Sequence, residues 1–387
     1  MKSCYAVTND ESIVEKIDSC IKQAVQAQAS DIHFESAAIG MRIRFRIDGV
    51  LYDQGVIPKE FIPQILGRLK VLAHIDSTEK RVPQDGKFSR EFEKNIIDFR
   101  VSTFPCSYGE KVVVRILDRA IHTINLDDLG FSIDVLQRCK GLFYKQQGLF
   151  LVTGPTGSGK TTTLYAGLSL LHSSEKNIVT LEDPVEYTLD GITQGHINPQ
   201  VGFTFESGIR AVLRQDPDIL MVGEIRDKQT AHTAIEASLT GHLILSTLHT
   251  NDSPSSIIRL IDMGVESYLL NASLIGVLAQ RLVRILCSEC KQQEKCTLDE
   301  KRWLNLEYVY RAYGCSLCAH HGYKGRLGIF ELLIITPEIK ALITDQPNKD
   351  AITHCALQQG MQTLMQDGIA KVKQGIISPE ELLRVIV

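Results

Sequence analysis

The chain has 387 residues, of which 44% are hydrophobic and 23% are charged, and its formal net charge is −4. This composition is that of a globular protein with about two or three domains, and the charge excludes a general attraction to nucleic acid or anionic lipid. No uncharged run approaches the ~18 residues that a membrane span requires, and the first residues lack the apolar core of a signal peptide, so we expect a cytoplasmic protein.

Residues 1–120 predict a small α+β domain. Apolar residues at helical spacing indicate helices over 11–28 and 60–75. Alternation of polar and apolar residues indicates strands, and an Asp48-Gly49 turn joins two of them as a hairpin. The expected strands are 30–35, 41–47, 50–52, 96–103 and 111–117.

Arginines are prominent on these expected strands. Arg42, Arg44 and Arg46 share one face of a single strand, and a solvated polar face accounts for them. Arg100 and Arg115 also lie on strands, and the pattern alone is compatible with exposed charges at both positions.

From residue 121 the pattern changes to alternating strands and helices, which predicts an α/β domain with a mostly parallel sheet. Residues 121–147 are expected to be a linker plus a first helix, Leu126 to Gly141. The core is expected over 148–286, with a helical region from 251 to 284, and a helical C-terminal part over 327–387.

The stretch from Gly154 to Thr161 fits the pattern G-x-x-x-x-G-K-[ST] of a phosphate-binding loop, or P-loop. An apolar strand precedes it and a helical pattern follows, as the motif requires. Glycines let the backbone N–H groups face the phosphates of ATP. The lysine neutralises the charge of these phosphates, and the hydroxyl group of Thr161 binds Mg²⁺. The expected nucleotide-binding residues here are Gly154, Pro155, Thr156, Gly157, Ser158, Gly159, Lys160, Thr161 and Thr162.

Further polar residues follow other expected strands, at the edge where a parallel sheet places its ligand. Glu182, Asp183 and Glu186 follow one strand, Glu224 another, and His249 a third. Gly223 stands before Glu224, where many P-loop enzymes have an aspartate for Mg²⁺.

We expect Glu224 to activate the attacking water, with Glu186 as its rival and Lys160 as the catalytic cation. His249 is interpreted either as a γ-phosphate contact or as a buried histidine bonded within its own loop.

Two C-x-x-C pairs, separated by 24 residues, predict a structural zinc site made by Cys287, Cys290, Cys315 and Cys318. Four thiolates close a tetrahedral shell, so this metal would fold a subdomain, 287–326, without taking part in chemistry. Cys296, His320 and His321 are near enough in sequence to be substitute ligands, and a redox pair is the weaker alternative.

Together these motifs resemble the secretion ATPases of type II secretion and type IV pilus assembly, almost from end to end. The resemblance is carried by Arg81–Lys87, Leu181–Tyr187, Ile219–Asp227, Gly241–Asp252 and Cys315–Arg326. It implies a RecA-like P-loop ATPase core with a smaller α+β amino-terminal domain and a Cys₄ zinc subdomain. The tetracysteine segment favours assembly or secretion over the related retraction motors, which lack it.

The resemblance also implies a cytoplasmic homohexamer, peripheral at the inner membrane and docked on a platform protein of the pilus or secretion machine. ATP hydrolysis would then rotate one domain against the other. Arg100 and Arg115 match arginines of the amino-terminal domain that close over the phosphates, and Arg210 and Arg214 match arginines of the core. An arginine supplied across a cleft stabilises transition-state charge.

Two other functions stay open at this point. A DNA-uptake or conjugation-type translocation ATPase would need basic, aromatic surfaces, which the net charge and the mixed charges of the cysteine segment do not favour, so no nucleic acid is expected. A non-catalytic nucleotide-responsive scaffold would not need Lys160, Glu186 and Glu224 together.

Overall fold

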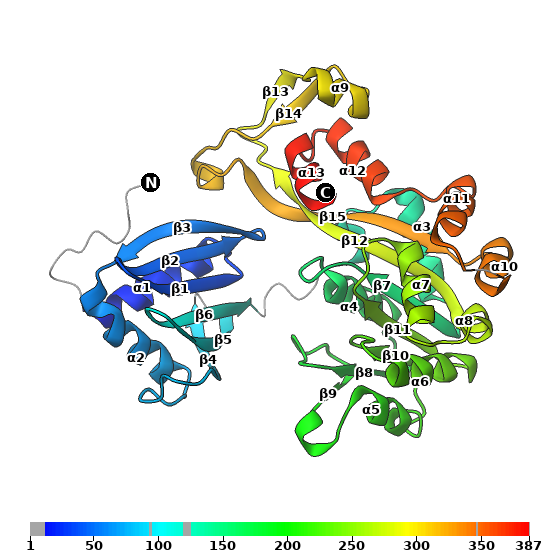
Figure 1. Ribbon diagram of the computed structural model, residues 1–387, viewed down its shortest axis with the longest axis horizontal. Coiled ribbons are helices and arrows are strands. Elements are labelled where there is room, and N and C mark those ends of the chain that lie inside the picture. The colour runs from blue at the N-terminus through cyan, green and yellow to red at the C-terminus, as the bar shows by residue number, and fades with distance from the viewer. Residues whose placement is uncertain (1–11, 93–94, 119–124, 346, 387) are drawn as a thin grey trace. The chain divides into compact units, whose positions relative to one another are not determined.

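The computed structural model describes residues 12–92, 95–118, 125–345 and 347–386 (Figure 1). The chain forms two compact units, Met1–His122 and Thr123–Val387, each with its own sheet and hydrophobic core. The domain boundary expected at 120/121 lies outside the described residues.

The first unit is a six-stranded antiparallel sheet with the order β3-β2-β1-β6-β5-β4. Two helices supply the apolar residues that pack against one face of this sheet, and side chains such as Phe34 and Phe99 lie fully buried between them. Its elements are α1 (Ile13–Gln26), β1 (Asp31–Ala37), β2 (Gly40–Ile47), β3 (Val50–Ile57), η1 (Lys59–Phe61), α2 (Ile62–Leu72), β4 (Gln84–Phe92), β5 (Asn95–Cys106) and β6 (Gly109–Asp118).

Local chemistry explains how these elements begin and turn. Ser12 and Glu15 form a reciprocal capping box at the start of α1. Asp48 and Gly49 both have positive φ, 47° and 83°, which the tight hairpin turn between β2 and β3 requires. The sequence analysis missed β4, because its alternating residues are mostly polar or half-exposed.

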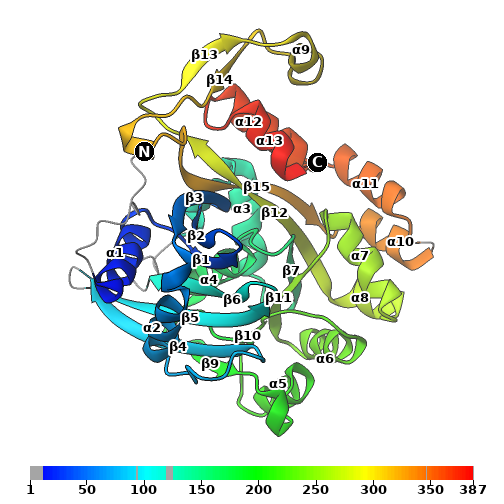
Figure 2. The same ribbon diagram turned by 60° about the vertical axis from the view of Figure 1, so that its left-hand side comes forward.

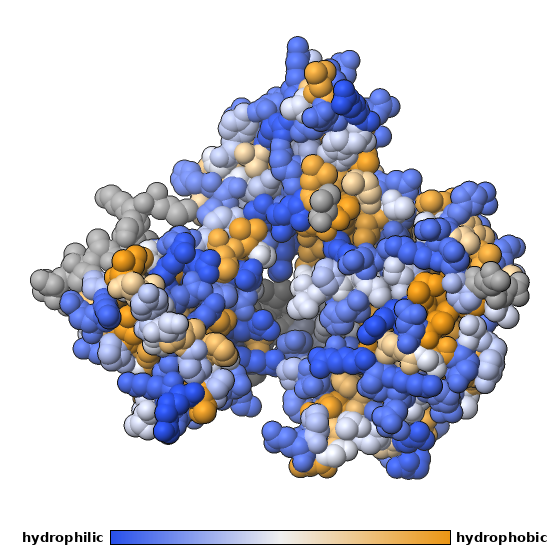
Figure 3. All heavy atoms as spheres, in the orientation of Figure 1, coloured by the Kyte–Doolittle hydropathy of each residue, from blue (hydrophilic) through white to orange (hydrophobic). Residues whose placement is uncertain are grey.

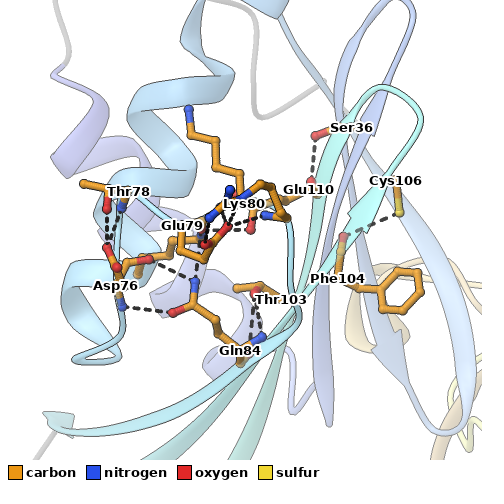
Figure 4. A network of polar contacts seen from close by, with 12 residues as sticks. Ser36, Asp76, Thr78, Glu79, Lys80, Gln84, Thr103, Phe104, Cys106 and Glu110 are labelled. Atoms are coloured by element: carbon orange, nitrogen blue, oxygen red, sulfur yellow. Dashed lines mark hydrogen bonds and ion pairs between the residues drawn. The ribbon is translucent and has the colours of Figure 1, made fainter.

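A buried ion pair organises the loop between α2 and β4 (Figure 4). Lys70 Nζ lies 2.7 Å from Glu110 Oε1, and both side chains are almost fully buried. Lys70 also donates to the carbonyl oxygen of Glu79. Gln84 closes the same loop, because its amide group exchanges hydrogen bonds with the main chain of Asp76 at 3.0 Å and donates to Glu79.

The polar face of this sheet carries the arginines of β2. Arg44 makes two hydrogen bonds of 2.8 Å to Glu35, and Arg42 pairs with Asp53 in solvent. The expectation of a polar face is therefore confirmed, with most of its charge paired within the sheet.

The second unit is built on a seven-stranded sheet with the order β15-β12-β7-β11-β10-β8-β9, in which only β15 is antiparallel to its neighbour. The predicted α/β class with a mostly parallel sheet is thus confirmed. The strands of this sheet are β7 (Gly148–Thr153), β8 (Ile178–Glu182), β9 (Thr193–His196), β10 (Ile219–Val222), β11 (Leu243–Leu248), β12 (Leu274–Leu286) and β15 (Tyr323–Ile334). The second unit also contains a separate pair of strands, β13 (Gln292–Lys295) and β14 (Tyr308–Arg311).

Helices cover both faces of this sheet, because its central strands are apolar on both sides. The cluster on one face includes α3 and α4, and the cluster on the other face includes α5 to α8, α10 and α11. The helices are α3 (Ile133–Phe143), α4 (Lys160–Leu171), α5 (Phe205–Val212), α6 (Lys228–Leu239), α7 (Ser253–Asp262), α8 (Ser267–Ser273), α9 (Leu298–Leu304), α10 (Pro337–Asp345), α11 (Lys349–Gln358), α12 (Leu364–Lys373) and α13 (Pro379–Ile386), with short 3₁₀ turns η3 (Leu126–Leu129), η4 (Pro199–Val201) and η5 (Ser316–Cys318).

Three expectations need correction. The helical region expected up to residue 284 ends at α8, and residues 274–286 are the long strand β12. The part expected to be helical from 327 begins as strand, because β15 runs to Ile334 and pairs with β12. The helix expected over 126–141 is a 3₁₀ turn followed by α3, with Gly130 at positive φ between them.

The cysteine segment is inserted between β12 and β15. Its hairpin, β13 and β14, and helix α9 stand out from the rest of the second unit beside α12 and α13 (Figures 1 and 2). Apolar residues of α12 and α13 pack with Leu304 and Val309 of this segment. On the face drawn in Figure 3, hydrophobic residues are scattered in separate groups among hydrophilic ones. Among the helices of the described residues, none combines the length and apolar character needed to span a bilayer.

Candidate active site

The P-loop connects β7, a central strand, to α4. Gly154, Gly157 and Gly159 adopt φ angles of 152°, 79° and 86°, which other residues rarely adopt. A Cβ atom on Gly154 would lie 2.5 Å from the carbonyl oxygen of Gln280, so the loop also passes too close to a neighbouring strand for a side chain. Gly159 precedes the first turn of α4 and gives it no side-chain cap. The backbone N–H groups of that turn are therefore suited to an anion.

Lys160 lies at the start of α4 and is buried. Its ammonium group donates to the carbonyl oxygens of Gly154 and Pro155 at 2.9 and 3.1 Å. Burial lowers the pKa of Lys160 to about 8, Glu224 opposes this shift, and Arg281 adds to it. The structure thus brings Lys160 into the electrostatic range of one acid and one further cation.

The remaining P-loop residues differ in exposure. Residues 155–157 and Thr161 are exposed, and Thr162 is half-buried. Ser158 is buried, and its hydroxyl group has no hydrogen-bond partner in the structure. An orphaned hydroxyl and an exposed threonine at a helix start fit a phosphate group and a Mg²⁺ ion.

Glu224 follows β10, and both of its carboxylate oxygens are engaged. Oε1 pairs with Arg226 Nη2 at 2.5 Å, and Oε2 lies 3.2 Å from His249 Nε2. The side chain of His249 is 45% exposed, so its interpretation as a buried histidine within its own loop is wrong. The structure instead joins the predicted acid and the predicted histidine across β10 and β11.

Close packing favours glycine at position 223, where many P-loop enzymes have an aspartate. The Gly223 N–H group donates to the carbonyl oxygen of Leu181 at 2.8 Å, and an added Cβ would lie 3.2 Å from that oxygen. Thr247 Oγ1 also donates to the Gly223 carbonyl at 2.8 Å. The tips of β8, β10 and β11 therefore meet closely here, and a side chain at position 223 would require its neighbours to shift by a few tenths of an ångström.

The acids after β8 are in different environments. Glu182 is buried and accepts hydrogen bonds from Tyr165, Thr180 and Gln194. Burial and the Glu182 carboxylate together raise the pKa of Tyr165. Asp183 is exposed and Glu186 is half-buried. In the sheet order, β8 is one strand further from β7 than β10 is, so Glu224 starts nearer to the P-loop than Glu186 does.

The four predicted arginines lie on elements of two different units. Arg210 pairs with Glu206 on α5, and Arg214 donates to the carbonyl oxygen of Arg210 at 2.7 Å, with both side chains exposed. Arg100 and Arg115 belong to the first unit, where they face each other in the β5–β6 register. Arg115 pairs with Asp31 at 3.0 Å.

The sequence analysis missed two residues of β12 at this edge of the sheet. Gln280 donates to the carbonyl oxygen of Ser158 in the P-loop, and Arg281 donates to the carbonyl oxygen of Asn251 in the segment after β11. The signal was the polar pair that directly follows the apolar run Leu274–Ala279. It was overlooked because that run was assigned to helix.

The predicted metal ligands form one compact group. The ligand atoms of Cys287, Cys290, Cys315 and Cys318 all lie within 4.8 Å of one another. Neighbouring Sγ atoms are 3.7 to 3.8 Å apart. A tetrahedron with Zn–S bonds of ~2.3 Å has edges of about 3.8 Å, so these residues fit zinc.

Main-chain donors support the cluster. Cys290 Sγ accepts from the N–H of Gly314 at 3.2 Å, and Cys318 Sγ accepts from those of Cys315 and Gly322 at the same distance. Burial opposes ionisation of Cys318, but these donors and the neighbouring thiols lower its pKa to about 6. Such bonds stabilise thiolate sulfur. The substitute ligands Cys296, His320 and His321 are not in the group that the described residues form.

Comparison with known proteins gives consistent results. The family model described as "Type II/IV secretion system protein" matches residues 6–384. The "Type II secretion system ATPase E" of Vibrio cholerae is 45% identical over 382 residues, which cover 97% of this chain and 76% of that protein. A "Type II secretion system protein E" of Pseudomonas aeruginosa shows the same identity and coverage.

Solved structures show a related fold. The pilus retraction motor PilT with bound ADP has a TM-score of 0.65 and 26% identity, over 97% of each chain. The ATPase DotB of Legionella pneumophila has a TM-score of 0.73 and 20% identity, over 98% of each chain. The latter likeness concerns the fold alone.

Proposed function

Since this chain belongs to the type II/IV secretion system protein family, we propose that it is a P-loop ATPase that powers type II secretion. One observation carries the proposal. The P-loop, Glu224 and His249 lie at the carboxyl edge of one mostly parallel sheet. Glu224 contacts His249, and its charge acts to raise the pKa of Lys160. Open α/β sheets bind their ligands at the carboxyl ends of the strands, so a nucleotide and the groups that hydrolyse it are expected at this edge.

The residues divide the work as follows. The backbone N–H groups of residues 156–162 and the ammonium group of Lys160 bind the β- and γ-phosphates. Thr161 holds Mg²⁺, which neutralises phosphate charge when it is bound. The Glu224 carboxylate accepts a proton from the attacking water, and His249 orients that carboxylate through its Nε2 contact. Glu186, in the segment that follows β8, is the alternative acid for this step.

The wider assignment rests on the relatives. We propose a cytoplasmic homohexamer, peripheral at the inner membrane and bound to a platform protein of the secretion machine, in which hydrolysis rotates the amino-terminal domain against the core. Arg100, Arg115, Arg210 and Arg214 contact nucleotide in that assembly. The four cysteines hold a structural Zn²⁺. The names of the relatives support type II secretion over pilus assembly and over DNA translocation.

The test is phosphate release by the full chain and by Lys160→Ala. The variant should lose ATP turnover while its circular dichroism and thermal unfolding stay those of the parent chain. Lys176→Ala, at an exposed position, is the matched control and should keep full turnover. Normal ATPase activity in Lys160→Ala would overturn the active-site assignment, and a mass of one protomer under every nucleotide condition would overturn the ring.

A further inference from the structure

Gln280 lies beside the P-loop but comes from a strand more than 100 residues away in sequence. Strand β12 runs parallel to β7, and Ala279 is in register with Thr153, the last residue of β7. Gln280 is therefore level with Gly154, where the P-loop begins. Its side chain is only 1% exposed.

Both ends of the Gln280 amide are used. Nε2 donates to the carbonyl oxygen of Ser158 at 2.6 Å, and Oε1 accepts from Thr163 Oγ1 at 2.8 Å. Ser158 belongs to the loop, and Thr163 belongs to the first turn of α4. One side chain thus fastens the loop to the helix that it enters.

Residue 280 also lies close to two glycines of the loop. A Cβ on Gly154 would lie 2.5 Å from the Gln280 carbonyl oxygen, and a Cβ on Gly159 would lie 3.0 Å from Gln280 Nε2. Gly157, by contrast, has no atom within 4 Å of such a Cβ. The close approach of β12 therefore shapes both ends of the loop.

The bond to Ser158 has a direct consequence for phosphate binding. In a planar trans peptide, the C=O and N–H groups point in opposite directions. Because the Ser158 carbonyl is held toward β12, the N–H of Gly159 is held away from β12. An N–H group fixed in this direction needs no reorganisation when an anion binds.

Arg281, the next residue, extends this connection over the other face of the sheet. Its guanidinium group donates to the carbonyl oxygens of Gln280 at 3.1 Å and Asn251 at 2.8 Å. Thr153, the last residue of β7, also contacts the segment after β11, because its hydroxyl group lies 2.8 Å from Thr250 Oγ1. The start of the P-loop and the segment that carries His249 are thus joined through β12 as well as directly.

We propose that Gln280 is a positioning residue of the nucleotide site: its amide holds the Ser158–Gly159 peptide and α4 in the form that binds phosphate. The proposal rests on the proposed function, because it concerns the same P-loop. It assigns Gln280 no contact with the reacting atoms.

The experiment compares Gln280→Leu with Asn271→Leu in the full chain. Asn271 is a matched control, because its amide also donates to a main-chain carbonyl, that of Lys340, and to a threonine hydroxyl, that of Thr344. It precedes β12, whose first residue is level with the start of β7, whereas the P-loop follows the end of β7. Equilibrium binding of ADP, thermal unfolding, and KM and kcat for ATP are measured for each variant.

Loss of the amide should weaken ADP binding roughly tenfold and raise KM for ATP similarly, as expected when one buried hydrogen bond is lost. Asn271→Leu should lower the unfolding temperature by a similar amount and leave ADP affinity unchanged. Equal ADP affinities in both variants and the parent chain would overturn the proposal. So would parallel losses of affinity in both variants, which would indicate a general effect of destabilisation.

Two more variants test the two hydrogen bonds of the Gln280 amide separately, and they replace Gln280→Leu if that variant does not fold. Gln280→Glu keeps an acceptor for Thr163 but loses the donor to Ser158, and Thr163→Val removes only the Thr163 bond. Gln280→Glu should lose more ADP affinity than Thr163→Val, and the reverse order would contradict the proposal. A parent chain that neither binds nor hydrolyses ATP would refute the proposed function itself, which is a separate outcome.

Discussion

Replacing Cys318 by serine is expected to remove tight zinc binding from the chain. Three of the Sγ–Sγ separations are 3.7 to 3.8 Å, against about 3.8 Å in a zinc-bound tetrahedron, and all four ligand atoms lie within 4.8 Å of one another. Binding therefore requires little rearrangement of the cysteines. We choose Cys318 because its Sγ accepts two main-chain hydrogen bonds, from the N–H groups of Cys315 and Gly322.

The magnitude follows from this geometry. A structural site with four thiolates binds Zn²⁺ with an apparent free energy of roughly 10–16 kcal/mol at pH 7, which corresponds to a Kd at or below the nanomolar range. A serine hydroxyl is a poor ligand and leaves both main-chain donors without their sulfur acceptor. We expect zinc affinity to fall by at least about 100-fold, since outer-shell changes alone cost 10–100-fold.

The assay is the zinc content of the purified full chain, followed by competition with a chromogenic chelator. Trp303 in α9 is the single tryptophan, so its fluorescence reports on the folding of this segment. Cys296→Ser is the matched control, because Cys296 is a buried cysteine of the same segment outside the cluster. It should keep one zinc per chain. Unchanged affinity in Cys318→Ser, or loss of zinc in Cys296→Ser, would refute the reasoning.

Three further outcomes are expected. Glu224→Gln should lower kcat about 10²–10⁴-fold with little change in ATP affinity, and single-turnover phosphate release that falls more in Glu186→Gln would reverse the roles of these acids. Lys70→Met leaves the buried Glu110 carboxylate unpaired and should destabilise the first unit by roughly 3–5 kcal/mol; unchanged hydrogen-exchange protection there would contradict this. Burial opposes ionisation of Glu35, but two neighbouring cations lower its pKa from 4.5 to about 2. Its contribution to stability is therefore complete above pH 4.5 and is lost as the pH falls toward 2. Urea unfolding at pH 5 and pH 3 should show a smaller pH effect in Glu35→Gln, and an equal effect would contradict this assignment.

The sequence by itself determined the features whose signal is local. The P-loop is one continuous stretch, its glycines and lysine are dictated by the phosphate chemistry, and the flanking strand and helix follow from apolar spacing. The paired C-x-x-C motifs likewise specify four ligands from short loops. Glu224 and His249 were found because parallel strands deliver their carboxyl ends to one edge.

Only the tertiary structure decided which segments meet at that edge. The first half of β12 is almost entirely buried and apolar, and such a short apolar run does not distinguish strand from helix. Its pairing with β7 arises from contacts between residues more than 100 positions apart, and these contacts bring Gln280 to the P-loop. The contact between Glu224 and His249, and the close packing around Gly223, depend on the same long-range packing. No local pattern encodes them, because each side chain's partner lies on another strand.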